Sequence, residues 1–352
     1  MNLYYIANSI YQFAYALPVY KRIGGTFVVH NKKKYKHFMR EMAGVAAHGE
    51  NNNKSTPDII IVKREDVNQL EGILFFLANT INPGAQYEKS ITLFHEHGTS
   101  DKKYEGGSPI AIKKLEKYDY ILLSGPKNKA RLHDIGLDLP ESKMIQIGCL
   151  RFDDYLSNVI NREDSIHALG IIDEDRPTIL YAPTWKFGNG TFKALANHFI
   201  KTITKDYNLI LRPHYHDRRY ARLLYLWHKL IGRKHVYYSP PEKLISADTY
   251  AAFAASDLLI SDMSSVIYEY LITGQPIILA SNAFKAQHKM PDTLSVRPHV
   301  EIYDGQIPIN DLINAELGRS NGIYSSLLTN CFYNTSGGAV EKTVSFIQSL
   351  KN

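Results

Sequence analysis

The stretch SDMSSVIYEYLITGQPIIL, residues 261–279, is the clearest indication of the fold in the sequence. An apolar run, DLLI at 257–260, leads into it, and a helical pattern and a second apolar run follow. This order is typical of a buried parallel strand that turns into a helix. Asp262, Ser264 and Ser265 stand at the turn, either as helix caps or as groups that bind a ligand.

The same alternation of short apolar runs and helical patterns extends along the whole chain. Strands are predicted at residues 2–7, 26–30, 58–62, 90–95, 119–125, 144–148, 178–183, 208–213, 235–239, 257–261 and 276–280. Helical periods are predicted at residues 192–204, 220–230 and 338–350. Such alternation predicts an α/β fold of two Rossmann-like, doubly wound domains whose strand-end loops face one cleft.

A polar segment, REDSIHALGIIDEDRP at 162–177, marks the boundary between these domains. We therefore expect a first domain at 1–165 and a second at 166–335. The last helical pattern, within 336–352, is expected to pack back on the first domain.

Composition restricts the class of protein. The chain has 352 residues, of which 44% are apolar and 22% charged, so it can bury real cores. Its two cysteines, Cys149 and Cys331, argue against a disulfide framework and suit a reducing cytoplasm. The first cation, Lys21, follows the apolar start instead of preceding it, so no signal peptide is expected. The longest apolar run, residues 72–78, is far shorter than the ~20 residues of a membrane span.

The net charge of +6 is unevenly distributed. Residues 1–150 carry 20 Lys and Arg against 15 Asp and Glu, and KKKYK at 32–36 is the densest basic patch. This patch is either a solvated helix face or a surface for anionic lipid or a phosphate-bearing substrate. The excess is small for a nucleic-acid binder and no such motif is present, so we expect no nucleic-acid partner.

Four polar clusters follow predicted strands, where ligands bind in open α/β sheets. They are HEHGTSDKK (95–103), PTWK (183–186), PHYH (213–216) and SDMSSV (261–266). A helix beginning at about Ser264 would present backbone N–H groups to a phosphate, and Lys186, Arg212 and His214 would add charge. Neither a P-loop nor a GxGxxG turn is present, so the pattern favours another type of phosphate site.

His97 precedes Gly98, which permits a tight turn and the close approach of a substrate. A histidine there can accept a proton from an incoming hydroxyl at neutral pH. The HxH pairs at 95–97 and 214–216 could instead hold a metal ion, although no HExxH pattern accompanies them. We favour the general base and expect no metal.

Read together, five segments resemble the CDP-glycerol glycerophosphotransferases of teichoic acid synthesis. That family has motifs of the form HGTPLK, GxPRxD, YAPTWR, LRxHP and TDYSSVxFDYxLTxKPIIF. The chain has, in the same order, HGTSDK (97–102), GCLRFDDYL (148–156), YAPTWK (181–186), LRPHY (211–215) and the stretch at 261–279. The resemblance implies a GT-B fold, with an acceptor domain followed by a donor domain.

The resemblance also implies roles for single residues. His97 would be the catalytic base, and His214 would bind the donor phosphates during catalysis. The remaining donor-binding residues would be Thr184, Lys186, Arg212, Asp262, Ser264, Ser265 and Glu269. The acceptor-side residues would be Gly98, Thr99 and Asp101. Ser100 and Asp101 replace the family's Pro-Leu beside the base.

The implied reaction moves glycerol phosphate, or a related alditol phosphate, from CDP-glycerol to a polyprenyl-diphosphate-linked acceptor and releases CMP. It requires no cofactor, and it places the protein in the cytoplasm, peripheral on an anionic membrane surface. Three alternatives stay open. They are a GT-B glycosyltransferase with a nucleotide-sugar donor, a metal hydrolase built on the HxH pairs, and a non-catalytic nucleotide-binding module.

Overall fold

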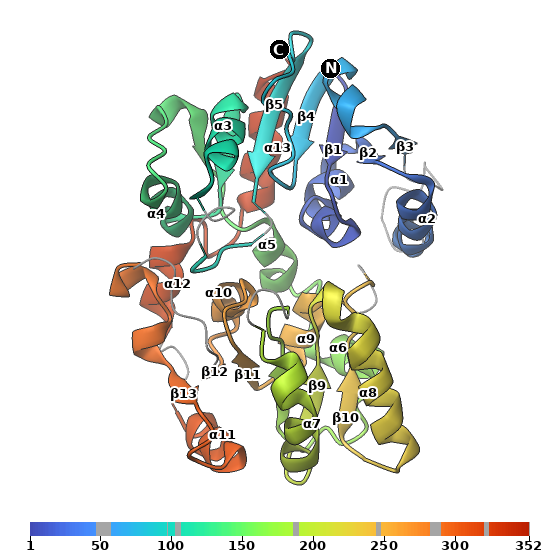
Figure 1. The fold of residues 1–352 in the computed structure, drawn as a ribbon, viewed down its shortest axis with the longest axis vertical. Helices are drawn as coiled ribbons and strands as arrows, with labels where there is room; N and C mark the ends of the chain where they lie inside the picture. Colours follow the sequence, from blue (N-terminus) through green and yellow to red (C-terminus); the bar gives the residue numbers. More distant parts are fainter. Residues whose placement is uncertain are drawn as a thin grey trace. The chain divides into compact units, whose positions relative to one another are not determined.

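The computed structural model describes residues 1–46, 58–96, 98–102, 107–185, 190–243, 248–281, 290–319 and 324–351. Two compact units are formed (Figure 1). The first comprises Met1–His97, Lys103–Asp154 and Cys331–Asn352, and the second comprises Gly98–Lys102 and Tyr155–Asn330.

The first unit is built on a seven-stranded parallel sheet. Its strand order is β3 (Ile59–Ile61), β2 (Thr26–Val29), β1 (Leu3–Ile6), β4 (Gly72–Phe76), β5 (Ser90–His95), β6 (Tyr120–Leu123) and β7 (Met144–Gln146). All five residues of β4 are buried, because helices cover both faces of a central parallel strand. The chain reverses its direction of winding between β1 and β4, which is the Rossmann order.

The helices of the first unit include the last one in the chain. They are η1 (Ile10–Tyr15), α1 (Leu17–Ile23), α2 (Lys32–Ala46), η2 (Arg64–Gln69), α3 (Pro109–Lys117), α4 (Pro126–Asp134), η4 (Glu141–Lys143), α5 (Leu150–Leu156) and α13 (Ala339–Ser349). The division between the units falls inside α5.

Helix α13 is joined to the first unit by specific contacts. The Asp153 carboxylate accepts the N–H groups of Ala339 and Val340 at 3.3 and 2.9 Å, and so caps the helix. The rings of Phe346 and Tyr120 meet edge to face, with centroids 5.1 Å apart.

The second unit has a six-stranded parallel sheet of the same winding. Its order is β10 (Val236–Tyr238), β9 (Asn208–Leu211), β8 (Thr178–Tyr181), β11 (Leu258–Ser261), β12 (Ile277–Ala280) and β13 (Glu301–Tyr303). The flanking helices are α6 (Arg162–Leu169), α7 (Phe192–Ile203), η6 (Tyr215–Asp217), α8 (Arg218–Leu230), α9 (Thr249–Ala254), α10 (Val266–Tyr270), η7 (Leu271–Thr273), η8 (Asp292–Leu294), η9 (Arg297–His299), α11 (Ile309–Leu317) and α12 (Ser325–Cys331).

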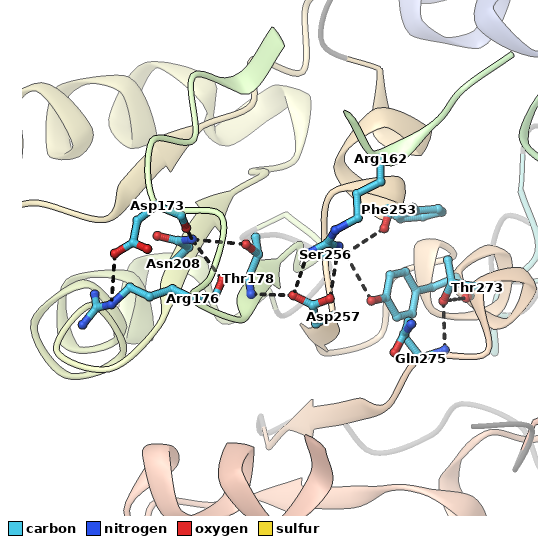
Figure 2. Close-up of polar contacts among 11 residues, drawn as sticks. Arg162, Asp173, Arg176, Thr178, Asn208, Phe253, Ser256, Asp257, Thr273 and Gln275 are labelled. Carbon is cyan, nitrogen blue, oxygen red and sulfur yellow. Dashed lines mark hydrogen bonds and ion pairs between the residues drawn. The ribbon is translucent and has the colours of Figure 1, made fainter. Parts of the chain in front are cut away.

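Polar contacts fix the amino ends of β8, β9 and β11 (Figure 2). The Asp257 carboxylate accepts the N–H of Thr178 at 2.7 Å and pairs with the Arg162 guanidinium at 3.1 Å. The Asn208 side chain donates to the carbonyl oxygen of Asp173 at 2.6 Å. These side chains are used structurally, so chemistry is expected at the opposite, carboxyl edge of the sheet.

The predicted α/β fold of two Rossmann-like, doubly wound domains is confirmed. Every predicted strand and all three predicted helices are present, but β4 and β13 were not predicted as strands. The helix expected at about Ser264 begins two residues later, at Val266, and has only five residues. No helix within the described ranges combines the length and apolarity needed to cross a membrane.

Candidate functional site

The switch point of the second sheet lies between β8 and β11, the neighbouring strands from which the chain winds in opposite directions. Ligands of doubly wound sheets bind at the carboxyl ends of such strands. The segments that leave these ends are residues 182–185 after β8 and residues 262–265 after β11. Both were predicted as site segments, and the strand pairing brings their starting points side by side.

The Asp262 side chain ties the two segments together. Its Oδ1 accepts the N–H groups of Thr184 at 2.8 Å and Met263 at 2.6 Å. Its Oδ2 accepts both the N–H and the hydroxyl of Thr191, at 2.8 and 3.0 Å. Burial raises the pKa of this carboxyl above its ordinary value, while the same hydrogen bonds act in the opposite direction. Four contacts to the protein make Asp262 an organiser of the loops, and its predicted contact with the donor stays a prediction.

Ser264 and Ser265 follow Asp262 at the start of α10, and both are half-buried. The Ser265 carbonyl oxygen accepts the N–H of Tyr268 at 3.1 Å, which begins the helical turn. Because α10 is short, its dipole offers less to an anion than the sequence suggested. The two hydroxyl groups are therefore the more important donors at this position.

Gly98 belongs to the second unit and packs against the start of α10. Its φ of +118° lies where residues with a side chain are strained. A Cβ atom added there would lie 2.9 Å from Ser265 Oγ and 3.1 Å from Glu269 Oε1. Glycine is thus required at this position both by its backbone conformation and by the space available.

The residues after Gly98 hold further contacts within the second unit. Thr99 is fully buried, and Asp101 accepts a hydrogen bond from the Tyr268 hydroxyl. The Lys102 ammonium group donates to Thr184 Oγ1 at 3.1 Å. Through Lys102, the segment that contains the predicted acceptor-side residues Gly98, Thr99 and Asp101 reaches the predicted donor residue Thr184. Sequence reasoning missed Tyr268 and Lys102, because their partners are distant in the chain.

Glu269 is a buried carboxylate on α10 that was predicted to face the nucleotide. Its Oε2 accepts a hydrogen bond from the Tyr250 hydroxyl at 2.8 Å. This contact fixes one oxygen of the carboxylate, and the other lies toward Gly98. Glu269 therefore forms part of the surface of α10 against which Gly98 packs.

Arg212 and His214 follow β9 but occupy different environments. The Arg212 guanidinium is buried and donates to Ser239 Oγ, the Pro240 carbonyl oxygen and Thr249 Oγ1, each at 3.0 Å. These contacts give Arg212 a structural role that the prediction of a donor-binding cation did not include.

His214 is half-buried and its ring is held by both hydrogen bonding and stacking. Its Nδ1 accepts the backbone N–H of His216 at 3.2 Å, which in the neutral ring places the proton on Nε2. The Trp185 ring stacks with a centroid 6.0 Å away, and the His216 ring does so at 5.2 Å. Nε2 of His214 is thus a donor of fixed direction, suited to a phosphate oxygen. Apart from its place in PTWK, no sequence pattern indicates this role of Trp185.

In the first unit, the end of β5 is anchored by an ion pair whose arginine is buried. Glu96 Oε2 lies 2.6 Å from Nη1 of Arg131 and accepts from the Asn128 amide at 3.1 Å. Arg131 and the fully buried Lys127 lie four residues apart on α4. His95 bonds the Leu122 carbonyl oxygen in the core at 3.1 Å. This cluster fixes Glu96, the residue before His97. The i, i+4 spacing of Lys127 and Arg131 after a strand is the sequence signal that could have indicated it.

His97 and Lys186 lie outside the described residues, so their predicted roles stay predictions. Within the described ranges, no group of three or more His, Cys, Asp and Glu side chains is placed to hold a metal ion.

Three comparisons with known proteins bear on this site. Residues 89–293, more than half of the chain, match the family model of CDP-glycerol:poly(glycerophosphate) glycerophosphotransferase. The teichoic acid glycerol-phosphate primase of Bacillus subtilis (strain 168) is 25% identical over 257 residues, which cover 68% of this chain and 62% of that protein. The chain therefore aligns with less than two thirds of this relative's length.

Solved structures with low sequence identity share the fold. The wall teichoic acid polymerase TagF, in a variant soaked with CDPG, matches with a TM-score of 0.63 and 16% identity, over 99% of this chain and 88% of that one. The UDP-GlcNAc 2-epimerase from Neisseria meningitidis, bound to UDP-GlcNAc, matches with a TM-score of 0.62 and 12% identity over 100% of both chains. At these identities the similarity concerns the fold alone.

Proposed function

The chain belongs to the CDP-glycerol:poly(glycerophosphate) glycerophosphotransferase family, and we propose on that basis that it transfers an alditol phosphate, most simply glycerol phosphate, from a CDP-linked donor to a hydroxyl group. One structural observation carries the proposal. Gly98, the residue directly after the proposed base His97, packs so closely against the donor-side residue Ser265 that a Cβ atom added to it would lie 2.9 Å from Ser265 Oγ. The segment that follows the proposed base therefore lies next to the end of β11, where the donor would bind.

On the donor side, we assign the diphosphate to the carboxyl ends of β8, β9 and β11. The hydroxyl groups of Ser264 and Ser265 and Nε2 of His214 would donate to its oxygens, and Lys186 would add positive charge. Asp262 would hold the loops in position without touching the donor, since its oxygens already accept four hydrogen bonds. The CDPG-soaked relative with the same fold supports a donor of this class.

The proposed reaction is a displacement at phosphorus. His97 removes the proton of the acceptor hydroxyl, and its oxygen forms a bond to the β-phosphorus of the CDP-alditol. The bond from that phosphorus to the bridging oxygen breaks, and CMP leaves with the bridging oxygen. Catalysis then depends on positioning and on offsetting phosphate charge. The step as written needs no cofactor.

The acceptor is proposed to be a hydroxyl of a polyprenyl-diphosphate-linked glycan or of a growing polymer, in teichoic acid or a related surface polymer. The protein would then work in the cytoplasm, peripheral on the membrane. Lys32, Lys33 and Lys36 at the start of α2 are exposed and suit an anionic surface. Lys34 is less suited, because it is half-buried and donates to the Asn8 carbonyl oxygen. Burial, together with Arg64, lowers its pKa.

The decisive experiment supplies the parent protein with CDP-glycerol, CDP-ribitol and UDP-sugar donors, and measures which nucleotide is released. We expect CMP from a CDP-alditol, with the acceptor required for rapid release. Release of a nucleoside diphosphate from a sugar donor would instead establish a glycosyltransferase. His97→Ala should lower turnover by ~10²–10⁴-fold and leave donor affinity nearly unchanged. Turnover of this variant at the parent rate would remove His97 from the mechanism.

A further inference from the structure

Helix α8 of the second unit is drawn in yellow in Figure 1. Several of its large apolar side chains are exposed to solvent. Leu223, Trp227 and Leu230 are 69%, 59% and 79% exposed. Tyr220, Leu226 and Ile231 are also exposed. The helix and the residue that follows it therefore hold six of the fourteen exposed large hydrophobic residues in the described part of the chain. Such clustering marks an interaction surface, whereas single exposed apolar residues are normal.

The exposed residues form a continuous stripe. Residues 220, 223, 227 and 230 follow the spacing i, i+3, i+7 and i+10, which places them along one side of a helix. The side of the helix next to the stripe is used by the fold, where Ala221 lies in the core and Leu224 packs against it. His228, also on that side, bonds the Asn197 side chain of α7 at 2.9 Å. Leu223, Trp227 and Leu230 are therefore additional to the packing of α8, whereas the Tyr220 ring at the edge of the stripe also meets the core ring of Phe192 edge to face.

Cations border the stripe, and acids are absent from it. The sequence RRYARLLYLWHKLIGRKHVYY, residues 218–238, contains no Asp or Glu. Arg219, Arg222 and Lys229 are exposed, and the helical period places them along one flank of the stripe. On the other flank, the Lys193 ammonium group lies 5.6 Å from the centre of the Tyr220 ring. The face thus combines a central apolar band with positive charge on both sides.

We propose that this face of α8 docks on an anionic lipid bilayer. A helix that lies in a membrane interface has a basic polar face beside an apolar face rich in Trp and Leu. A second copy of this chain fits the face less well, because a symmetric contact would bring the cations of both copies together. The proposal does not rest on the transferase reaction, since none of these residues is among those assigned to the donor or the acceptor.

The first test is co-sedimentation with vesicles of phosphatidylcholine containing phosphatidylglycerol. The parent should pellet, and Leu223→Gln/Trp227→Gln/Leu230→Gln should need about tenfold more lipid for half-binding. Arg219→Gln/Arg222→Gln/Lys229→Gln should show a similar loss, and the parent should pellet less at high salt. The control is Ile302→Gln/Ile307→Gln, which replaces two other exposed apolar residues of the same unit and should pellet like the parent.

A second measurement locates the contact. The chain has two tryptophans, Trp185 and Trp227. Vesicles should shift the parent's fluorescence to the blue, and Trp227→Phe should lose that shift while still pelleting. The unfolding midpoint and CDP affinity of each variant show that the donor unit is intact, which separates this proposal from failure of the transferase assignment. Pelleting of the apolar triple variant at the parent's lipid concentration would overturn the proposal. The proposal would also be overturned if the parent were a dimer and the apolar triple variant were a monomer that binds vesicles as the parent does.

Discussion

Replacement of Gly98 by alanine tests whether the segment after His97 must lie against α10. The φ of +118° costs a residue with a side chain ~1–2 kcal/mol, by analogy with the left-handed helical region. The new methyl group would also lie 2.9 Å from Ser265 Oγ and 3.1 Å from Glu269 Oε1, and overpacking of this kind costs roughly 1–3 kcal/mol. Together these terms favour displacement of residues 98–102 over retention of the parent geometry.

A displacement of about 1 Å near reacting groups lowers a rate by roughly 100-fold. We therefore expect Gly98→Ala to lose about that factor in kcat, measured as CMP release from CDP-glycerol with saturating acceptor. Its stability, measured by urea unfolding, should fall by no more than ~2–5 kcal/mol. To exclude loss of activity through unfolding, kcat is measured under conditions in which all of the variant is folded.

The matched control is Gly274→Ala in the same unit. Gly274 has a φ of +68°, and a Cβ added there would meet nothing within 4 Å. It should lose ~1–2 kcal/mol of stability from backbone strain alone and keep kcat within about twofold. If folded Gly98→Ala turns over at the parent rate, the packing of Gly98 on Ser265 is not part of the mechanism.

Three further predictions concern other contacts. Asp262→Asn places an amide NH₂ group against N–H donors, and should lower the free energy of unfolding in urea by about 2–4 kcal/mol and weaken CDP binding in calorimetry. If stability and CDP affinity are both unchanged, Asp262 does not organise the loops. Glu96→Gln leaves the buried Arg131 charge without its ion partner and should destabilise the protein by about 3 kcal/mol, whereas Glu141→Gln in an exposed pair should change the unfolding midpoint little; equal effects would refute the distinction. His214→Ala should weaken both CDP and CDP-glycerol binding with the fold intact by circular dichroism, and undiminished CDP affinity would show that His214 does not hold the phosphates.

The sequence predicted the architecture well because buried parallel strands leave a simple signature. Strands such as β8 and β11 are apolar at consecutive positions, and each is followed by a recognisable turn. The two strands that were missed depart from this pattern in different ways. The apolar run that contains β4 was compared only with a membrane span, and it was not assigned to a strand. Strand β13 is a three-residue edge strand with two exposed residues. The predicted limits at 1–165, 166–335 and 336–352 stay predictions.

The site was predictable only in part, because its organising contacts join residues far apart in sequence. The ends of β8 and β11 could be located from the pattern, but the bond from Asp262 to Thr191 spans 71 positions. The bond from Asp101 to Tyr268 spans 167 positions. Similarly, nothing in the sequence around Arg212 distinguishes a structural guanidinium from one that binds a ligand. Such roles depend on which side chains the fold brings within 3 Å.

The placement of α13 in the first unit has a consequence for synthesis on the ribosome. The chain leaves this unit at Asp154 and returns to it only at Cys331. At roughly 5–20 residues per second, the Asp153 carboxylate would wait about 10–40 s for the N–H groups of Ala339 and Val340 that it caps. During that time the second unit can finish folding, while the first unit still lacks helix α13. The part of the protein made first is thus completed last, and it is the part that a chaperone would have to protect.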